Sequence, residues 1–123
     1  MSTPLHERTM LFAVRVVKLV KSLPRGVAEE VIAKQLMRSA TSIGANYREA
    51  SHAQSSADFA AKLKICESEA AETLYWLQLL VKAELVPESQ LKNLMMESEE
   101  LVAIFTASTK TARLSASPRQ RRG

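Results

Sequence analysis

Helix-breaking sequences occur at only three places between Pro4 and Leu114. Leu23-Pro24-Arg25-Gly26 ends the first segment, a polar stretch over 51–56 separates the second from the third, and Val86-Pro87 ends the third. With only three glycines and four prolines in 123 residues, the chain lacks the turn residues that β-sandwiches and small barrels need. Short connections favour antiparallel neighbours, so we predict one all-α domain, an antiparallel up-down-up-down four-helix bundle.

Each predicted helix carries an apolar seam at helical spacing. The helices are expected over about 4–23, about 27–50, from after Ser55 or Ser56 (either could be the N-cap) to the Val86-Pro87 break, and about 88–114. The seams are Leu5, Thr9, Phe12, Val16, Leu19 and Leu23; Ile32, Leu36, Ala40, Ile43 and Tyr47; Phe59, Leu63, Cys66, Ala70, Leu74, Leu77 and Val81; and Leu91, Leu94, Leu101, Phe105 and Ser108.

Two sets of apolar residues fall outside these seams. A surface helix of a monomer should be polar there, so we interpret both sets as a subunit interface. The alternative is that the first helix is deeply covered within the bundle. The residues are Met10, Leu11, Val14 and Val17 in the first helix and Tyr75, Trp76 and Leu79 in the third.

The net charge of +4 is unevenly distributed. Lys110 to Gly123 contain five cations and no acid, which leaves 12 cations against 13 acids in residues 1–109. We therefore divide the chain into a bundle over 1–114 and a disordered basic tail over 115–123. Exposed cations could contact RNA phosphates without reading sequence, although a basic tail also serves solubility. The candidates are Arg15, Lys18, Lys21, Arg25, Lys110, Arg113, Arg119, Arg121 and Arg122.

The residue types that catalysis and metal binding require are scarce. One cysteine and two histidines form neither a disulfide nor a zinc set, and they favour a reducing cytoplasm. The pair Glu49 and His52 matches half of a di-iron motif, and Cys66 lies on an apolar seam. We expect no enzyme, no cofactor, no metal and no small-molecule substrate. The apolar run Met10–Val14 is too short for a membrane span or a signal peptide.

Small and polar residues fill the second half of the second helix, where they are indifferent or poor helix formers. Small side chains allow helix backbones to approach closely, so we expect tight packing there; a ligand site is the alternative. The residues are Ser39, Thr41, Ser42, Gly44 and Asn46.

The stretch 35–46, QLMRSATSIGAN, resembles the Q-L-x-R-x-x-x-S-I-x-A-N signature of bacterial four-helix bundle proteins, also called 23S ribosomal RNA intervening-sequence proteins. The resemblance continues through Leu23-Pro24, 59–66 and 69–77, and it covers about residues 8–112. One departure follows Asn46, where the family usually reads I-x-E-G and this chain has YREA over 47–50.

The resemblance implies an antiparallel bundle that assembles as a homopentamer. It also implies mainly structural roles for Arg38, Ser42, Asn46 and Glu72, with Asn46 and Glu72 reaching across facing helices. The accessory variability protein of diversity-generating retroelements, a basic pentamer that works with RNA, is a more distant likeness in fold alone. We therefore expect a non-enzymatic, RNA-associated oligomer. The alternative is an adaptor that docks a protein partner without nucleic acid.

Overall fold

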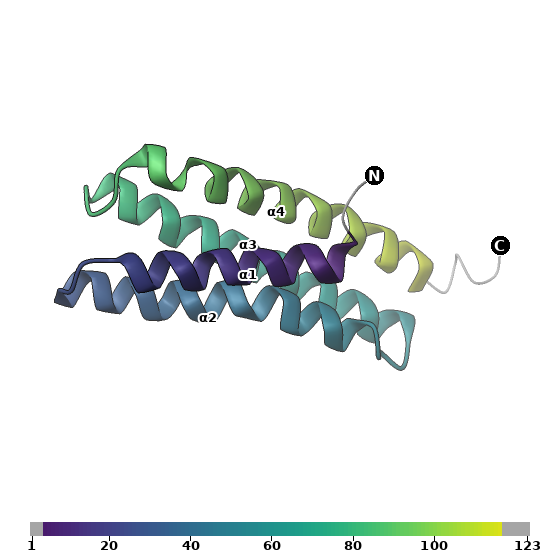
Figure 1. Ribbon diagram of the computed structural model, residues 1–123. Coiled ribbons are helices and arrows are strands. Elements are labelled where there is room, and N and C mark those ends of the chain that lie inside the picture. The colour runs from purple at the N-terminus through teal and green to yellow at the C-terminus, as the bar shows by residue number, and fades with distance from the viewer. Residues whose placement is uncertain (1–3, 117–123) are drawn as a thin grey trace.

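The computed structural model describes residues 4–116, which form four helices and no strand (Figure 1). The helices are α1 (Leu5–Ser22), α2 (Val27–Ala50), α3 (Ser56–Lys82) and α4 (Glu88–Ala116). They alternate in direction, which confirms the predicted antiparallel four-helix bundle. The last helix continues two residues beyond the predicted end at Leu114, and the rest of the predicted tail lies outside the described residues.

The helix ends follow the breaker sequences. Leu23 leaves the helical conformation because the ring of the next residue, Pro24, disfavours it, and its ψ is 142°. At the start of α3, the Ser55 side chain accepts a hydrogen bond from the Asp58 backbone N–H at 3.0 Å. Such a cap satisfies one of the free amide groups of the first turn, so α3 begins where the sequence predicts.

The apolar seams of α1 and α2 are nearly as predicted, whereas those of α3 and α4 differ. Thr73 and Leu80 are buried in α3, while Leu74 and Val81 are only half-buried and Phe59 is exposed. The reason is that α3 packs against both α2 and α4, so its buried sector depends on two neighbours. In α4, Ser98, Thr109 and Ala112 are buried and the predicted Ser108 is half-buried.

The first helix is attached mainly through α2. Its backbone packs along that of α2, approaches that of α4 at few places and does not come within 8 Å, between Cα atoms, of that of α3. The close approach occurs at Gly44, where a Cβ atom would lie 3.0 Å from Thr9 Oγ1. This confirms tight packing at one of the small residues of α2. It also leaves much of α1 without a covering neighbour.

A pair of buried hydroxyl groups joins α2 to α3. The Oγ of Ser39 lies 2.9 Å from the Oγ1 of Thr73, and both residues have no exposed surface. Each hydroxyl group is also close to a carbonyl oxygen in its own helix, that of Leu36 or Glu69. The small residue Ser39 thus serves as an internal hydrogen-bond partner.

This pair predicts a non-additive effect on stability. Thr73→Val should lower the free energy of unfolding by about 1–2 kcal/mol, because Ser39 loses a buried partner. The double variant Ser39→Ala/Thr73→Val should recover part of that loss, because neither polar group remains. Urea denaturation of the single and double variants measures the coupling, and strictly additive losses would contradict a direct contact.

Candidate functional site

The exposed apolar surface of α1 is the most unusual feature of the fold. Met10 and Leu11 are each 51% exposed and Val14 is 40% exposed, while Val17 is half-buried. A groove of about 880 Å³ runs between α1 and α2 beside this surface, lined by Met10, Val14 and Val17. From here on, the α1 face means Met10, Leu11, Val14 and Val17. The predicted off-seam residues of α1 therefore lie together, three of them exposed.

The second predicted apolar set lies on α3 and is largely covered. Tyr75 is 55% exposed, but Trp76 and Leu79 are half-buried against the core. The Trp76 indole N–H donates to Glu72 Oε2 at 2.9 Å, and the rings of Tyr75 and Trp76 meet edge to face with centroids 4.9 Å apart. All three residues were expected to project outward from α3, but only Tyr75 is exposed. The Trp76 side chain is held along its own helix.

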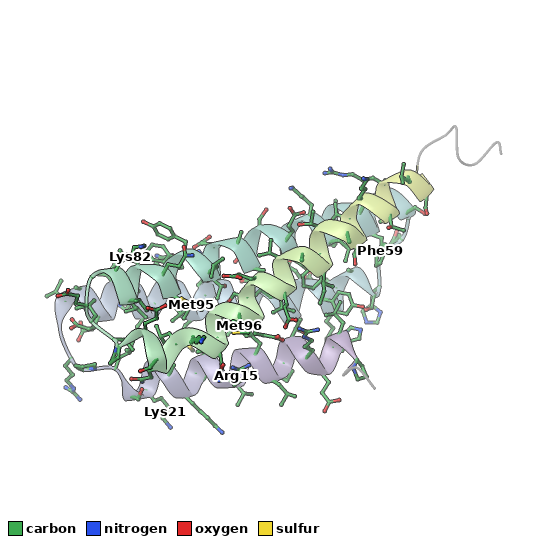
Figure 2. The ribbon with its side chains drawn as sticks, turned by 90° about the horizontal axis from the view of Figure 1, so that it is seen from above. Arg15, Lys21, Phe59, Lys82, Met95 and Met96 are labelled. Atoms are coloured by element: carbon green, nitrogen blue, oxygen red, sulfur yellow. The ribbon has the colours of Figure 1, made fainter. Side chains whose placement is uncertain are left out.

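The two apolar sets face different sides of the bundle. No Cα atom of α1 lies within 8 Å of one in α3, and in the view from above the two helices lie along opposite edges (Figure 2). Arg15 and Lys21 project from the α1 edge, and Lys82 projects from the α3 edge. One molecule therefore presents the α1 face and Tyr75 in different directions.

The predicted RNA-contacting cations separate into two groups. Lys18 and Lys21 border the α1–α2 groove, with Arg15 and Arg25 exposed nearby in the sequence. Lys110 and Arg113 lie near the other end of the bundle, where α4 ends. Within residues 4–116 none of these six side chains forms an ion pair. The remaining candidates, Arg119, Arg121 and Arg122, lie outside the described residues.

The first and last helices are joined by an ion pair that the sequence spacing did not predict. Arg8 donates from Nε to Glu97 Oε2 at 2.7 Å and from Nη2 to Glu97 Oε1 at 2.8 Å, and it also reaches Glu100 at 2.9 Å. The hydrogen bond from Arg8 holds the pKa of the Glu97 carboxyl below its usual value, against the opposing effect of burial. Two parallel hydrogen bonds fix the geometry of such a pair.

This pair predicts a pH-dependent contribution to stability. Because the folded-state pKa of Glu97 is lowered, its stabilisation is present above the unfolded pKa of about 4.3 and is lost as pH falls through the folded pKa. Glu97→Gln should therefore lower the thermal midpoint at pH 7 and have less effect at pH 3. Thermal unfolding across this range tests the prediction, and an equal loss at both pH values would contradict it.

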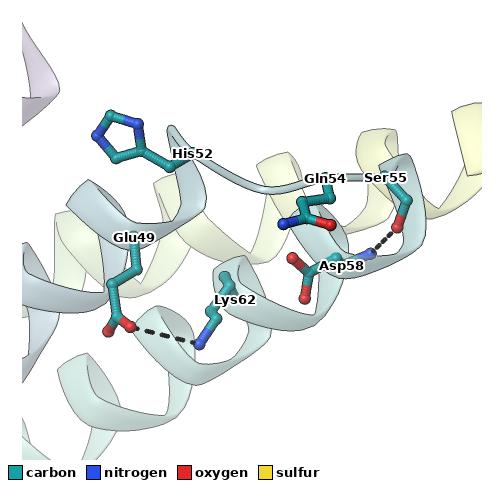
Figure 3. Close-up of a pocket in the computed structure, with 6 residues that line it drawn as sticks. All are labelled: Glu49, His52, Gln54, Ser55, Asp58 and Lys62. Atoms are coloured by element: carbon teal, nitrogen blue, oxygen red, sulfur yellow. Dashed lines mark hydrogen bonds and ion pairs between the residues drawn. The ribbon is translucent and has the colours of Figure 1, made fainter.

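A polar pocket of about 540 Å³ lies at the turn between α2 and α3 (Figure 3). Glu49 pairs with Lys62 at 3.7 Å, whereas the His52 ring points away from Glu49. Within residues 4–116, no three His, Cys, Asp or Glu residues come together as a metal site.

Burial raises the pKa of the Cys66 thiol to about 12, so almost no thiolate is present there at neutral pH.

Comparison with known proteins identifies the family. The family described as 23S rRNA-intervening sequence protein matches residues 4–107. The chain belongs to this family. A crystal structure of a protein of unknown function from the S23 ribosomal protein family of Bacteroides thetaiotaomicron VPI-5482 is 43% identical and covers 87% of this chain and 99% of its own, with a TM-score of 0.81. No curated protein sequence matches significantly.

The motif residues of this 23S rRNA-intervening sequence protein separate into an inter-helix cluster and an intrahelical pair. Arg38 on α2 pairs with Glu72 and, at 3.2 Å, with Glu69 on α3. In contrast, the Asn46 amide donates to the Ser42 carbonyl at 2.9 Å, and the Ser42 hydroxyl donates to the Arg38 carbonyl at 2.7 Å. The expectation that Asn46 reaches a facing helix was therefore wrong, because its amide is used within α2.

None of the four helices in residues 4–116 of this intervening-sequence protein is long and apolar enough to cross a membrane. The features left without a structural role are the α1 face, the groove beside it and the two groups of cations. These surfaces are the candidates for function.

Proposed function

We propose that this 23S rRNA-intervening sequence protein is a non-enzymatic, cytoplasmic homo-oligomer, a pentameric ring, that acts as an RNA-associated accessory factor. The observation that carries the proposal is the α1 face, where three large apolar side chains are between 40% and 51% exposed beside an apolar groove. Contiguous apolar surface of this kind marks an interaction site in a soluble protein.

The positions of the two apolar surfaces support a ring. The α1 face and Tyr75 lie on different sides of one molecule, so the α1 face of one copy can meet the α3 side of the next. Such a head-to-tail contact uses two different surfaces, and it closes into a ring when the rotation between copies allows it. A contact between two identical surfaces would instead give a dimer.

The charge distribution supports contact with RNA. Six exposed cations lie on α1, on α4 and in the α1–α2 connection, and none forms an ion pair within residues 4–116. The family name refers to ribosomal RNA, and the Bacteroides relative is described as a member of a ribosomal protein family. An oligomer repeats each group of cations, so weak phosphate contacts on separate copies reinforce one another.

Two measurements test the proposal. Sedimentation equilibrium should give five times the mass of the chain, and a stable monomer would contradict the ring. Binding of single-stranded RNA should weaken with salt, and removal of 117–123 should lower the log-log salt slope by about 2, since three arginines are lost. Binding that ignores both salt and this truncation would contradict phosphate contact.

The exposed Tyr75 ring favours a second candidate function, a protein-interaction adaptor. Aromatic side chains are enriched where proteins bind one another. Pull-down from a nuclease-treated lysate separates the two functions. A partner protein that is recovered without RNA and lost in Tyr75→Ser supports the adaptor.

A further inference from the structure

The outward side of α3 carries no charged residue along most of its length. Between Lys64 and Lys82 every exposed residue of this helix is uncharged, whereas a helix face that meets water normally carries charged side chains. The exposed residues recur every three or four positions, so they form one stripe along the helix. This stripe, from here on the α3 face, consists of Ile65, Ser68, Ala71, Tyr75 and Gln78.

The α3 face and the α1 face have complementary shapes. On α3 the small side chains of Ser68 and Ala71 lie between two large ones, Ile65, which is 40% exposed, and Tyr75, which is 55% exposed. The α1 face instead presents bulky apolar side chains, also three and four positions apart. Small residues on one helix let the side chains of another enter between its larger ones. The two faces therefore fit as a depression and a ridge.

Tyr75 is held in place by contacts within its own molecule. Arg38 on α2 pairs with Glu72, and Glu72 Oε2 accepts the Trp76 indole N–H at 2.9 Å. The Trp76 ring meets the Tyr75 ring edge to face, with centroids 4.9 Å apart. An exposed aromatic side chain that is already ordered loses little rotamer entropy on binding. The motif residues Arg38 and Glu72 thus position an exposed anchor, which is evidence for a partner independent of the small residues.

The charges beside the two surfaces are also complementary. Three half-buried carboxylates flank the α3 face, and within residues 4–116 they pair with two cations. The α1–α2 groove is lined by Arg48, an exposed cation outside the set proposed for RNA, which forms no ion pair in the described part of the chain. An excess carboxylate therefore meets an excess cation when the surfaces join. The carboxylates are Glu67, Glu69 and Glu72, and their cations are Lys64 and Arg38.

We propose that the α3 face binds the α1 face of a second copy of this chain, with Tyr75 entering the α1–α2 groove of that copy. The groove has a volume of about 880 Å³ and apolar walls from Met10, Val14 and Val17, which suit an aromatic ring. Since α1 and α3 lie along opposite edges of the molecule, the same contact repeats head to tail from copy to copy (Figure 2). The inference rests on the proposed homo-oligomer and names the residues that join its copies.

Cross-linking through introduced cysteines tests which faces meet. The native Cys66 is buried, so it does not compete for the reagent. A short bismaleimide should join copies of Val14→Cys/Ala71→Cys into a ladder on a denaturing gel, because every copy then carries one thiol on each face. Val14→Cys alone and Ala71→Cys alone should give single chains, because like faces do not meet in a head-to-tail contact. The matched control Val14→Cys/Ala103→Cys places the second thiol at an exposed alanine of α4 and should give no ladder.

The outcomes separate this contact from the proposed homo-oligomer. Dimers formed by either single variant would mean that like faces meet, and they would overturn the head-to-tail contact. If the double variant sediments as an oligomer but gives no ladder, the contact between the two faces is overturned and the homo-oligomer stands. A wild-type chain that sediments as a monomer overturns both.

Tyr75→Ala tests the anchor itself. It should raise the dissociation constant between copies by about tenfold or more, because central aromatic side chains supply much of the binding free energy of an interface. The matched control Tyr75→Phe keeps the ring and its packing against Trp76, so it should assemble as the wild type does. Tyr75 is 55% exposed, so the helical content of both variants, measured by circular dichroism, should be unchanged. Equal dissociation constants for Tyr75→Ala and the wild type in sedimentation equilibrium would overturn the assignment of Tyr75.

Discussion

Replacing Phe105 by alanine should lower the free energy of unfolding by about 3–5 kcal/mol, the largest loss expected from any single substitution described in this protein. Phe105 has no exposed surface, and its ring meets Tyr47 edge to face at 5.7 Å between centroids. Tyr47 in turn lies 4.5 Å from the ring of His6. Truncation therefore leaves a cavity where α4, α2 and α1 come together, and the neighbouring helices can fill it only in part.

The chain offers a matched control for this prediction. Phe59 has the same side chain but is 37% exposed at the start of α3, so Phe59→Ala should lower the free energy of unfolding by less than half as much. Urea denaturation at one fixed protein concentration measures both variants, because assembly adds a concentration-dependent contribution. Equal losses in the free energy of unfolding would contradict the prediction that Phe105 contributes more to the core than Phe59.

Val14→Glu should dissociate the proposed oligomer. In a ring each interface would bury Val14 of one copy, and a buried carboxylate without a partner is unfavourable by at least about 3 kcal/mol per interface. Since every copy carries the change, the assembly should fall to monomers at micromolar concentrations in sedimentation velocity. The folded chain should survive, because Val14 is 40% exposed in the single molecule.

Val31 provides the matched control for the interface. It is also an exposed valine on a helix, but it lies near the start of α2 and does not line the α1–α2 groove. Val31→Glu should leave the mass of the oligomer unchanged. If both variants sediment as the wild type does, the α1 face is not the interface. If both dissociate, the assembly depends on a surface that extends beyond the α1 face.

The parts of the fold that local rules control could be predicted from the sequence. Pro24 and the serines before Asp58 mark helix ends through geometry that involves only neighbouring residues. The angular position of Met10 and Val14 on α1 also follows from the helical repeat, which is why both were expected to lie off the seam. Once the core is known to lie on the seam side of the helix, residues off the seam are expected to be exposed.

Side-chain partners across the bundle could not be predicted in the same way. Arg8 and Glu97 are 89 positions apart, and their contact depends on how far α1 and α4 slide along one another. That displacement cannot be inferred from the positions of the two residues in the sequence. Arg38 shows the same limit, because its pairing with Glu69 and Glu72 depends on the rotation of α3 against α2.

The sequence alone therefore determined the number of helices, where the breaks between them fall, the inward sides of α1 and α2, and the family signature, since each depends on contacts within a few residues or on one helical repeat. The tertiary structure decided which helices pack against one another and how far each is displaced along its neighbour. It left the α1 face uncovered, buried Thr73 in place of Leu74, and paired Arg38 with Glu69 and Glu72. These outcomes depend on packing between helices, whose rotation and displacement are set by side chains far apart in the chain.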